Sequence, residues 1–229
     1  MVRFFNGFYN CFVDNLCCLW HLFCLKLLNN EKTNSTITVY STCDFWAGWI
    51  KIIHKGKKKF EKENYDKAST YLNNALELNP NYVDAHFYTG LLNTKLKQYD
   101  KAILNYNKVL ELDLYNELAY LNRGRINYIL KNREAAQSDF KNAIEIDSKF
   151  IEAYYNLVLV SQSLKDYKTG ILAITKLIEF NPNFRNFFRR GLIKYRMGDK
   201  VGACKDAKKS KKLNPNFSLV NQLIKNSCN

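Results

Sequence analysis

Small and apolar side chains recur at a fixed spacing along this chain. In the segment from Tyr65 to Pro80, the residues Ala68, Leu72 and Ala75 are spaced so that they share one face of a helix. Copies of this segment follow, and their first small residues are Ala102, Ala136, Gly170 and Ala203. The successive steps from Ala68 are 34, 34, 34 and 33 residues. A fixed period of this length predicts a solenoid of stacked helical repeats.

An earlier helix is predicted in each repeat, marked by an aromatic or aliphatic residue and, four positions later, by glycine or a substitute. The pairs are Ile52 with Gly56, His86 with Gly90, Tyr120 with Gly124, Tyr154 with Val158 and Phe187 with Gly191. Glycine inside a helix costs up to about 1 kcal/mol relative to alanine, so its recurrence indicates a packing role. We expect the two helices of a unit to approach closely there, with the small residue of the second helix completing the contact.

This order of aromatic residue, glycine, alanine, aromatic or aliphatic residue, alanine and closing proline resembles the tetratricopeptide repeat. Five units fit the pattern: 49–82, 83–116, 117–150, 151–183 and 184–217. The resemblance implies an all-α fold, a right-handed α-solenoid of about five helix-turn-helix units. Val158 and Gly170 depart from the pattern, so we expect irregular packing between the helices of the fourth unit. In the first unit, Lys59 stands where the pattern has a tyrosine.

Both ends of the chain differ from the repeats. Residues 218–229 predict a capping helix, because solenoids need a terminal element that covers the apolar face of the last unit. Its apolar positions at helical spacing are Phe217, Leu219, Val220, Leu223 and Ile224. At the other end, residues 1–30 form a leader rich in Phe, Leu and Cys, and residues 31–48 read as a linker.

The leader leaves several interpretations open. Its densest apolar part, Leu16 to Leu28, is shorter than the roughly 20 residues that span a bilayer. Asp14 interrupts an extension upstream and also breaks the apolar region that a signal peptide needs. An acylated anchor, a targeting signal and a poorly ordered leader remain as alternatives. Residues 1–30 are therefore the candidate for membrane contact, and the candidate acylation sites are Cys11, Cys17, Cys18 and Cys24.

Cysteine usage indicates a reducing compartment for the repeats. Five of the seven cysteines lie at or before Cys43, which leaves only Cys204 and Cys228 in the rest of the chain. We therefore expect no disulfide framework and a cytoplasmic location. The spacing of cysteines and His21 in the leader misses the paired arrangement of zinc sites, so no metal or other cofactor is expected.

Chemistry-bearing motifs are missing from the sequence. It contains no nucleophile elbow, no HExxH and no phosphate-binding glycine loop, and no cysteine and histidine pair up within the repeats. His54 and His86 fall on first helices, where packing or contact with a ligand explains them better than catalysis. The sequence therefore predicts a protein that is not an enzyme.

The resemblance also implies that the first helices line a concave groove that binds peptides. Carried onto this chain, the strongest candidates for peptide binding are Asn122, Arg125, Tyr155, Asn156, Arg185, Phe188, Arg189, Tyr195 and Arg196. Further groove positions are Asp84, Tyr88, Lys95, Leu121, Tyr128 and Gln162. The C-terminal end of this set combines aromatic and cationic residues, which suits an acidic peptide.

One branch of the family, the chaperone-binding cochaperones, holds the acidic C-terminal tail of heat-shock chaperones in a clamp of five residues. The equivalent positions in units three to five are Leu121, Arg125, Asn156, Arg185 and Arg189. Asn156 and Arg189 match the clamp, Arg185 is a conservative change, Arg125 is a different donor, and Leu121 lacks a charge. The partial match favours a scaffold or cochaperone-like adaptor that binds a peptide such as a chaperone tail.

The charge distribution supports an acidic partner but leaves a rival. The net charge is +14. From Arg185 onward the chain has twelve lysines and arginines but only two acidic residues, Asp199 and Asp206. The alternative function is therefore association with nucleic acid or anionic membrane through the lysines of KKSKKLNP, residues 208–215. Nucleic acid is the less favoured partner, because this run has no aromatic residue for base stacking. Cations near a helix C-terminus are also favourable without any partner.

Two pairs of opposite charge point to a structural role. Arg123 with Asp139, and Arg190 with Asp206, are each separated by 16 residues and occupy equivalent places in their units. This separation places the middle of a first helix beside the start of the second. We expect an ion pair within each unit, worth on the order of 1 kcal/mol or less if it is exposed.

Overall fold

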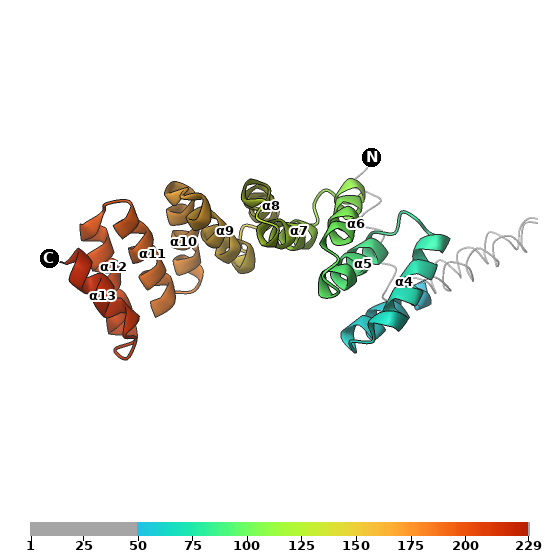
Figure 1. Cartoon of the computed structure of the whole chain (residues 1–229), viewed down its shortest axis with the longest axis horizontal. Coiled ribbons are helices and arrows are strands. Elements are labelled where there is room, and N and C mark those ends of the chain that lie inside the picture. The colour runs from blue at the N-terminus through green and yellow to red at the C-terminus, as the bar shows by residue number, and fades with distance from the viewer. Residues whose placement is uncertain (1–49, 229) are drawn as a thin grey trace, which may run out of the picture. The chain divides into compact units, whose positions relative to one another are not determined.

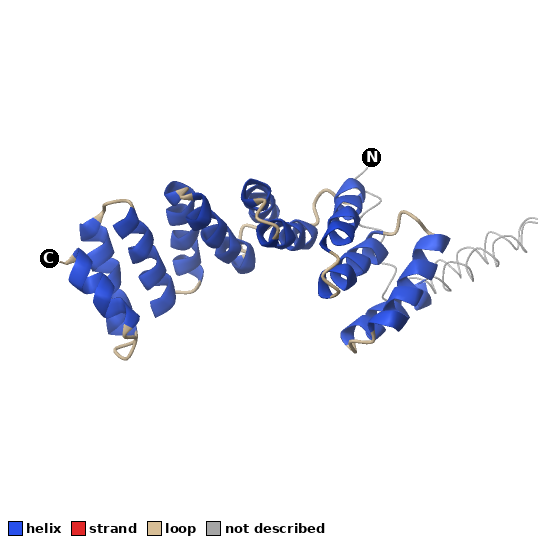
Figure 2. Cartoon of the chain, in the orientation of Figure 1, coloured by secondary structure: helices blue, strands red, loops and turns tan. Residues whose placement is uncertain are grey.

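The structure, a computed structural model, describes residues 50–228, and every regular element in this range is a helix (Figure 1 and Figure 2). The helices are residues 50–61, α4 (Tyr65–Leu78), α5 (Val83–Lys95), α6 (Tyr99–Leu112), α7 (Glu117–Ile129), α8 (Arg133–Ile146), α9 (Ile151–Leu164), α10 (Tyr167–Phe180), α11 (Phe184–Arg196), α12 (Lys200–Leu213) and α13 (Leu219–Ser227). The chain divides into two units after Lys51, and nearly all described residues belong to the second unit, Ile52–Asn229. The predictions for the leader and the linker lie outside the described residues.

The part from Ile52 to Asn229 is a helical solenoid. Each helix packs against the next, so that first and second helices of the repeat units alternate (Figure 1). Its core repeats with the sequence. Leu72, Tyr106, Phe140 and Ile174 stand at equivalent places on α4, α6, α8 and α10, and each is at most 1% exposed. Burying a side chain of this size contributes roughly 2 kcal/mol, so each unit adds a similar increment to one continuous core.

The recurring glycines make room for these large side chains rather than for the small residues of the second helix. A methyl group on Gly90 would lie 2.8 Å from Cε1 of Tyr106, and one on Gly124 would lie 2.8 Å from Cε1 of Phe140. The expected contact with the small residue occurs at Gly191, where a methyl group would approach the carbonyl oxygen of Ala203 at 3.2 Å. In the units of Gly90 and Gly124 the nearest neighbour of the glycine is therefore a ring of the second helix, and not the small residue that we expected there.

The fourth unit exchanges the two positions. Val158, which stands in the place of the glycine, is fully buried. Gly170 stands in the place of the alanine, and a methyl group added there would meet its nearest neighbours at an ordinary 3.6 Å. In this unit the larger residue, Val158, is therefore on the first helix α9, and the glycine, Gly170, is on the second helix α10.

The turn inside each unit has its own repeat, which the hydrophobic pattern does not reveal. A residue with positive φ follows each first helix, and these residues are Glu63, Lys97, Lys131, Lys165 and Gly198. The residue that follows is the N-cap of the second helix, and the side chains of Asn64, Asp166 and Asp199 accept a hydrogen bond from a backbone N–H of the first turn. A left-handed residue ends one helix, and the next residue starts the other.

The last helix, α13, covers the end of the solenoid. Val220 and Leu223 are buried against Ala207, whereas Leu219 is 65% exposed and takes no part in the cap. A disulfide joins Cys204 of α12 to Cys228, directly after α13. The expectation that these two cysteines stay unpaired was wrong, because the packing of α13 on α12 brings residues 24 apart in sequence side by side.

Candidate functional site

The first helices of neighbouring units contact one another through side chains on one face. We call this the first-helix face and define it by Lys57, Tyr88, Asn122, Arg125, Glu152, Tyr155, Asn156, Arg185 and Arg189. The contacts that join units along it include those of Lys57 with Tyr88, Arg125 with Glu152, and Tyr155 with Arg189. The charges on this face differ from one end to the other.

At its N-terminal end the face has a lysine held by an aromatic ring. Lys57 Nζ lies 5.3 Å from the centroid of the Tyr88 ring. Hydrogen bonding with the Tyr88 side chain and the nearby phenol raise the pKa of Lys57 above its ordinary value. Asp84 accepts a hydrogen bond of 3.1 Å from the hydroxyl of Tyr82. Both charged groups at this end therefore already have partners within the chain.

In the middle of the face the donors are also engaged. Arg125 on α7 forms an ion pair with Glu152 in the first turn of α9. The side-chain amide of Asn156 donates a 2.7 Å hydrogen bond to the carbonyl oxygen of Glu152, and Asn122 bonds in the same way to Leu118. Arg125 is thus neutralised by an acidic residue of the next unit, a partner that the sequence did not suggest.

At the C-terminal end, as at the N-terminal end, the cations lie over aromatic rings and have no ion-pair partner among the described residues. Arg189 lies over the ring of Tyr155, with Cζ 4.7 Å from the ring centroid, and Nη2 donates a 3.3 Å hydrogen bond to the Tyr155 hydroxyl. The Nη1 atom of Arg189 is enclosed and has no hydrogen-bond partner in the described part of the chain. Arg185, one turn earlier, lies 5.2 Å over the ring of Phe184. The helix that carries both arginines, α11, contains no acidic residue.

Three of the expected groove residues lie elsewhere. Leu121 is 1% exposed and belongs to the core. Phe188 and Tyr195 pack toward the cap helix α13, and the ring of Phe188 meets the ring of Phe217 edge-on at 5.0 Å. These aromatic residues therefore support the end of the solenoid. Arg196 and Tyr128 are exposed, and Gln162 is half-buried.

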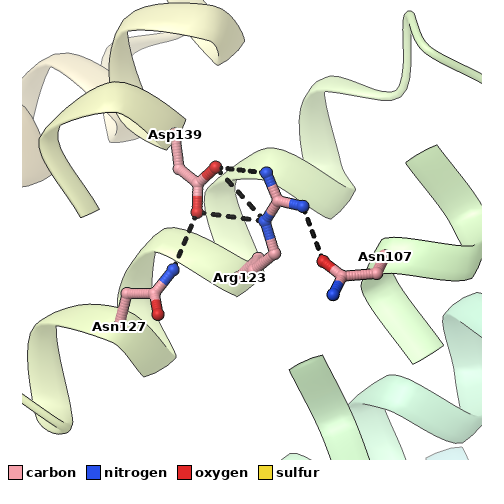
Figure 3. Close-up of polar contacts among 4 residues, drawn as sticks. All are labelled: Asn107, Arg123, Asn127 and Asp139. Carbon is pink, nitrogen blue, oxygen red and sulfur yellow. Dashed lines mark hydrogen bonds and ion pairs between the residues drawn. The ribbon is translucent and has the colours of Figure 1, made fainter. Parts of the chain in front are cut away.

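Arg123 and Asp139 come together in a buried polar network (Figure 3). Arg123 donates from Nε and Nη2 to the carboxylate, the shortest distance being 2.6 Å from Nη2 to Oδ1. Asn127 donates to Oδ2 at 3.1 Å, and Arg123 Nη1 donates to Oδ1 of Asn107 on α6 at 2.6 Å. The Asp139 side chain is 5% exposed, so this is a buried network rather than a surface pair. Asn107 and Asn127 were not predicted from the sequence.

Arg190 and Asp206 form the equivalent arrangement in the last unit. Arg190 Nη2 lies 2.7 Å from Asp206 Oδ1, and Lys194 Nζ lies 2.8 Å from Oδ2. Arg190 also donates to Thr175 on α10, at the place that Asn107 takes two repeats earlier. Burial by itself raises the pKa of Asp206, but the hydrogen bonds from Arg190 and Lys194 outweigh it, so the pKa lies below its ordinary value. Each network ties the two helices of a unit to the second helix of the preceding unit.

The lysine run on α12 stays outside these networks. Asp206 is the single acidic residue of α12 and is already bound by Arg190 and Lys194. Lys209 lies 5.9 Å over the ring of Phe187, and Lys208, Lys211 and Lys212 have no acidic partner among the described residues. The outer helix of the last unit thus has a basic surface of its own.

Sites of other kinds are not found in the part of the chain that the structure describes. Within residues 50–228, no three His, Cys, Asp or Glu side chains come close enough to hold a metal ion. In the same range no helix combines the length and the hydropathy that crossing a membrane requires.

Comparison with known proteins gives a consistent family. The model of the tetratricopeptide repeat matches residues 89–116, 118–150 and 151–184, and a second TPR repeat model matches residues 56–97. None of the curated proteins compared with this chain matches it in sequence.

Solved structures with the same fold include three named proteins. The crystal structure of MamA protein is 26% identical, with a TM-score of 0.67 over 75% of this chain and 94% of that one. YrrB, described as a TPR protein with an unusual peptide-binding site, is 16% identical, with a TM-score of 0.68 over 76% of this chain and 90% of that one. PilF of Pseudomonas aeruginosa is 21% identical, with a TM-score of 0.61 over 79% of this chain and 82% of that one.

Proposed function

Because this chain belongs to the tetratricopeptide repeat family, we propose that it is an adaptor that binds a peptide with an acidic C-terminus on its first-helix face. A scaffold of these repeats fits protein–protein interaction in general. The choice of an acidic peptide rests on this chain's own residues. YrrB, which shares the fold, is itself described as having a peptide-binding site.

The observation that carries the proposal is the state of Arg189. Its guanidinium is positioned by Tyr155, lacks an acidic partner among the described residues, and keeps one enclosed nitrogen without a hydrogen bond. An unsatisfied buried donor costs about 1–3 kcal/mol, so a rotation of the side chain that brings this nitrogen to a ligand oxygen would recover that free energy. A carboxylate suits the site because guanidinium and carboxylate form paired, charge-assisted hydrogen bonds.

The structure also argues for a smaller site than the clamp of five residues. Leu121 is buried, and Arg125 is already paired with Glu152. Three members remain: Asn156, Arg185 and Arg189, at the C-terminal end of the face. A chaperone tail is one candidate ligand, held by its terminal carboxylate, with less attraction for acidic residues further from the end.

Calorimetric titration of the full chain with a synthetic peptide ending in Glu-Glu-Val-Asp tests the proposal. The same peptide with an amidated C-terminus should bind at least about tenfold more weakly, since each 1.4 kcal/mol is a factor of ten. Arg189→Ala and Asn156→Ala should weaken binding of the free acid. Lys176→Ala is the control, because Lys176 is an exposed cation on the second helix α10 and lies outside the first-helix face. Equal affinity for acid and amide, or equal loss with the control, would exclude this site.

The lysines of α12 support a second candidate function, association with an anionic surface such as nucleic acid or an acidic membrane. The observation in its favour is that Asp206 already forms ion pairs with Arg190 and Lys194, so its negative charge does not neutralise the lysines of α12. Replacing Lys208, Lys211 and Lys212 by glutamine should then abolish retention on heparin and on anionic vesicles. Such binding should fall steeply with salt concentration, whereas a peptide site at Arg189 should be left intact by these changes.

A further inference from the structure

The cap helix α13 has little stability of its own. It is nine residues long, and isolated helices shorter than about 12–15 residues are marginal in water. Its position therefore depends on contacts with the last unit. Val220 and Leu223 are buried against Ala207, and Leu223 Cδ2 would lie 3.1 Å from a methyl group placed on Gly191.

The segment before α13 ties the cap to α11. The ring of Phe217 meets the rings of Phe184 and Phe188 edge-on, each at 5.0 Å. Arg185 and Arg189 lie on the same helix, each next in sequence to one of these phenylalanines. A movement of α13 would thus change the support of the helix that carries the unpaired cations.

A disulfide also links α13 covalently to α12. Cys204 lies in the second turn of α12 and Cys228 directly follows α13, so the bond encloses the C-terminal part of α12, the turn and the whole cap helix. Both cysteines are half-buried rather than enclosed. Lys208, one turn after Cys204, adds positive charge that favours the approach of a thiolate.

We propose that Cys204 and Cys228 form a redox-operated latch that holds α13 on the last unit and releases it when a thiol reductant opens the bond. In this exchange a reductant thiolate attacks one sulfur, the S–S bond breaks, and the other sulfur leaves as a thiolate that takes up a proton. A second reductant thiol then displaces the first cysteine from the mixed disulfide. Two electrons pass to the protein, which ends with two thiols, while the two reductant thiols end as a disulfide.

Release exposes a defined surface. Ala207, Phe188 and Tyr195 lose the cover of Val220, Leu223 and Phe217. Most of the remaining buried residues form a separate cluster that extends from α5 to α11, so the units in this range should keep their packing when the cap opens. The proposal does not depend on which ligand the first-helix face binds.

Hydrogen–deuterium exchange of the full chain, oxidised and then reduced with a thiol, tests the latch. Closing a loop of this size restricts the opened state enough that reduction should speed exchange in residues 217–228 on the order of a hundredfold. Exchange in residues 184–196 should rise to a smaller extent, and exchange in α6, α7 and α8 should stay unchanged. Cys228→Ser, at the very end of the last helix, should reproduce the reduced pattern without added thiol, and Cys204→Ser should agree with it.

Three results would overturn the proposal. In a non-reduced digest, Cys204 or Cys228 could be found free, or joined to one of the five cysteines before residue 44. Exchange of residues 217–228 could be the same in both redox states. Reduction could also unfold all units together, as seen in the circular dichroism, which would make the bond a staple of the whole fold rather than a latch on the cap.

Discussion

Arg189 of the fifth unit lies over the ring of Tyr155 of the fourth unit, 4.7 Å from guanidinium carbon to ring centroid. The ring keeps the guanidinium in place without neutralising it. An acidic side chain in the place of Tyr155 would hold the arginine as firmly but would repel a carboxylate ligand. The pair therefore joins two units and also holds the guanidinium of Arg189 in place with its positive charge unneutralised.

Replacing Tyr155 by alanine should weaken binding of an acidic-tail peptide by roughly two- to fivefold, because a cation–π contact at an exposed site is worth about 0.5–1 kcal/mol. Tyr155→Phe keeps the ring and should stay within a factor of two. Calorimetric titration of both variants gives the comparison. The interpretation is wrong if the phenylalanine variant loses as much affinity as the alanine variant.

Replacing Glu152 by glutamine should free Arg125 and strengthen binding of peptides that carry acidic residues upstream of the terminal one. The pair is exposed, so the gain should be modest, about two- to fivefold. A peptide with neutral residues upstream serves as the internal control and should bind both proteins equally. If the two peptides respond alike, Glu152 does not govern this part of the face.

Replacing Asp139 by alanine should destabilise the protein by about 2–3 kcal/mol, because it leaves the half-buried Arg123 without its partner. The partial exposure of Arg123 keeps the expected loss below that of a fully buried pair. Urea unfolding measures the difference. Glu111→Ala, which breaks the exposed pair with Lys108, is the control and should change stability by less than about 1 kcal/mol. Similar losses for the two variants would contradict a role for burial.

The lowered pKa of Asp206 should affect how the free energy of unfolding changes at acidic pH. A carboxyl whose pKa is lowered by folding contributes stability that is present above its unfolded value of about 3.9 and is lost as the pH falls through the folded value. Asp206→Asn should therefore be less stable than the wild type at neutral pH, and the difference should shrink below about pH 4. Urea unfolding across this range checks the sign, and a constant difference would show that the carboxylate charge is not the cause.

The left-handed turn residues predict an unusual response to glycine. Lys131 has φ of 67°, so Lys131→Gly should raise the free energy of unfolding by about 0.5–1 kcal/mol. The same substitution at Lys141, in the middle of α8, should lower it by about 1 kcal/mol, since glycine is a poor helix former. Thermal unfolding of both variants separates the two positions. A loss of stability in Lys131→Gly would count against backbone strain at this turn.

Residue spacing was enough to predict the family, the helical solenoid and the register of the repeats. It could do so because these depend on spacing along one chain: Ala68, Ala102 and Ala136 recur at 34 residues, and so do the buried side chains Leu72, Tyr106 and Phe140. The periodicity of each helix is visible in its own residues, and the stacking of similar units then follows. The same spacing pointed to Arg123 with Asp139 as neighbours within a unit.

The side-chain contacts between units and at the end of the chain could be seen only in the folded structure. Glu152 takes Arg125, Asn107 joins Arg123, and Cys228 reaches Cys204. None of these contacts follows from the repeat pattern. Each depends on the angle at which one helix crosses the next and on the side-chain rotamers that this packing allows. Phe188 fits the pattern of a groove residue, yet it lies against the cap, since α13 covers the side of α11 that faces away from the preceding units.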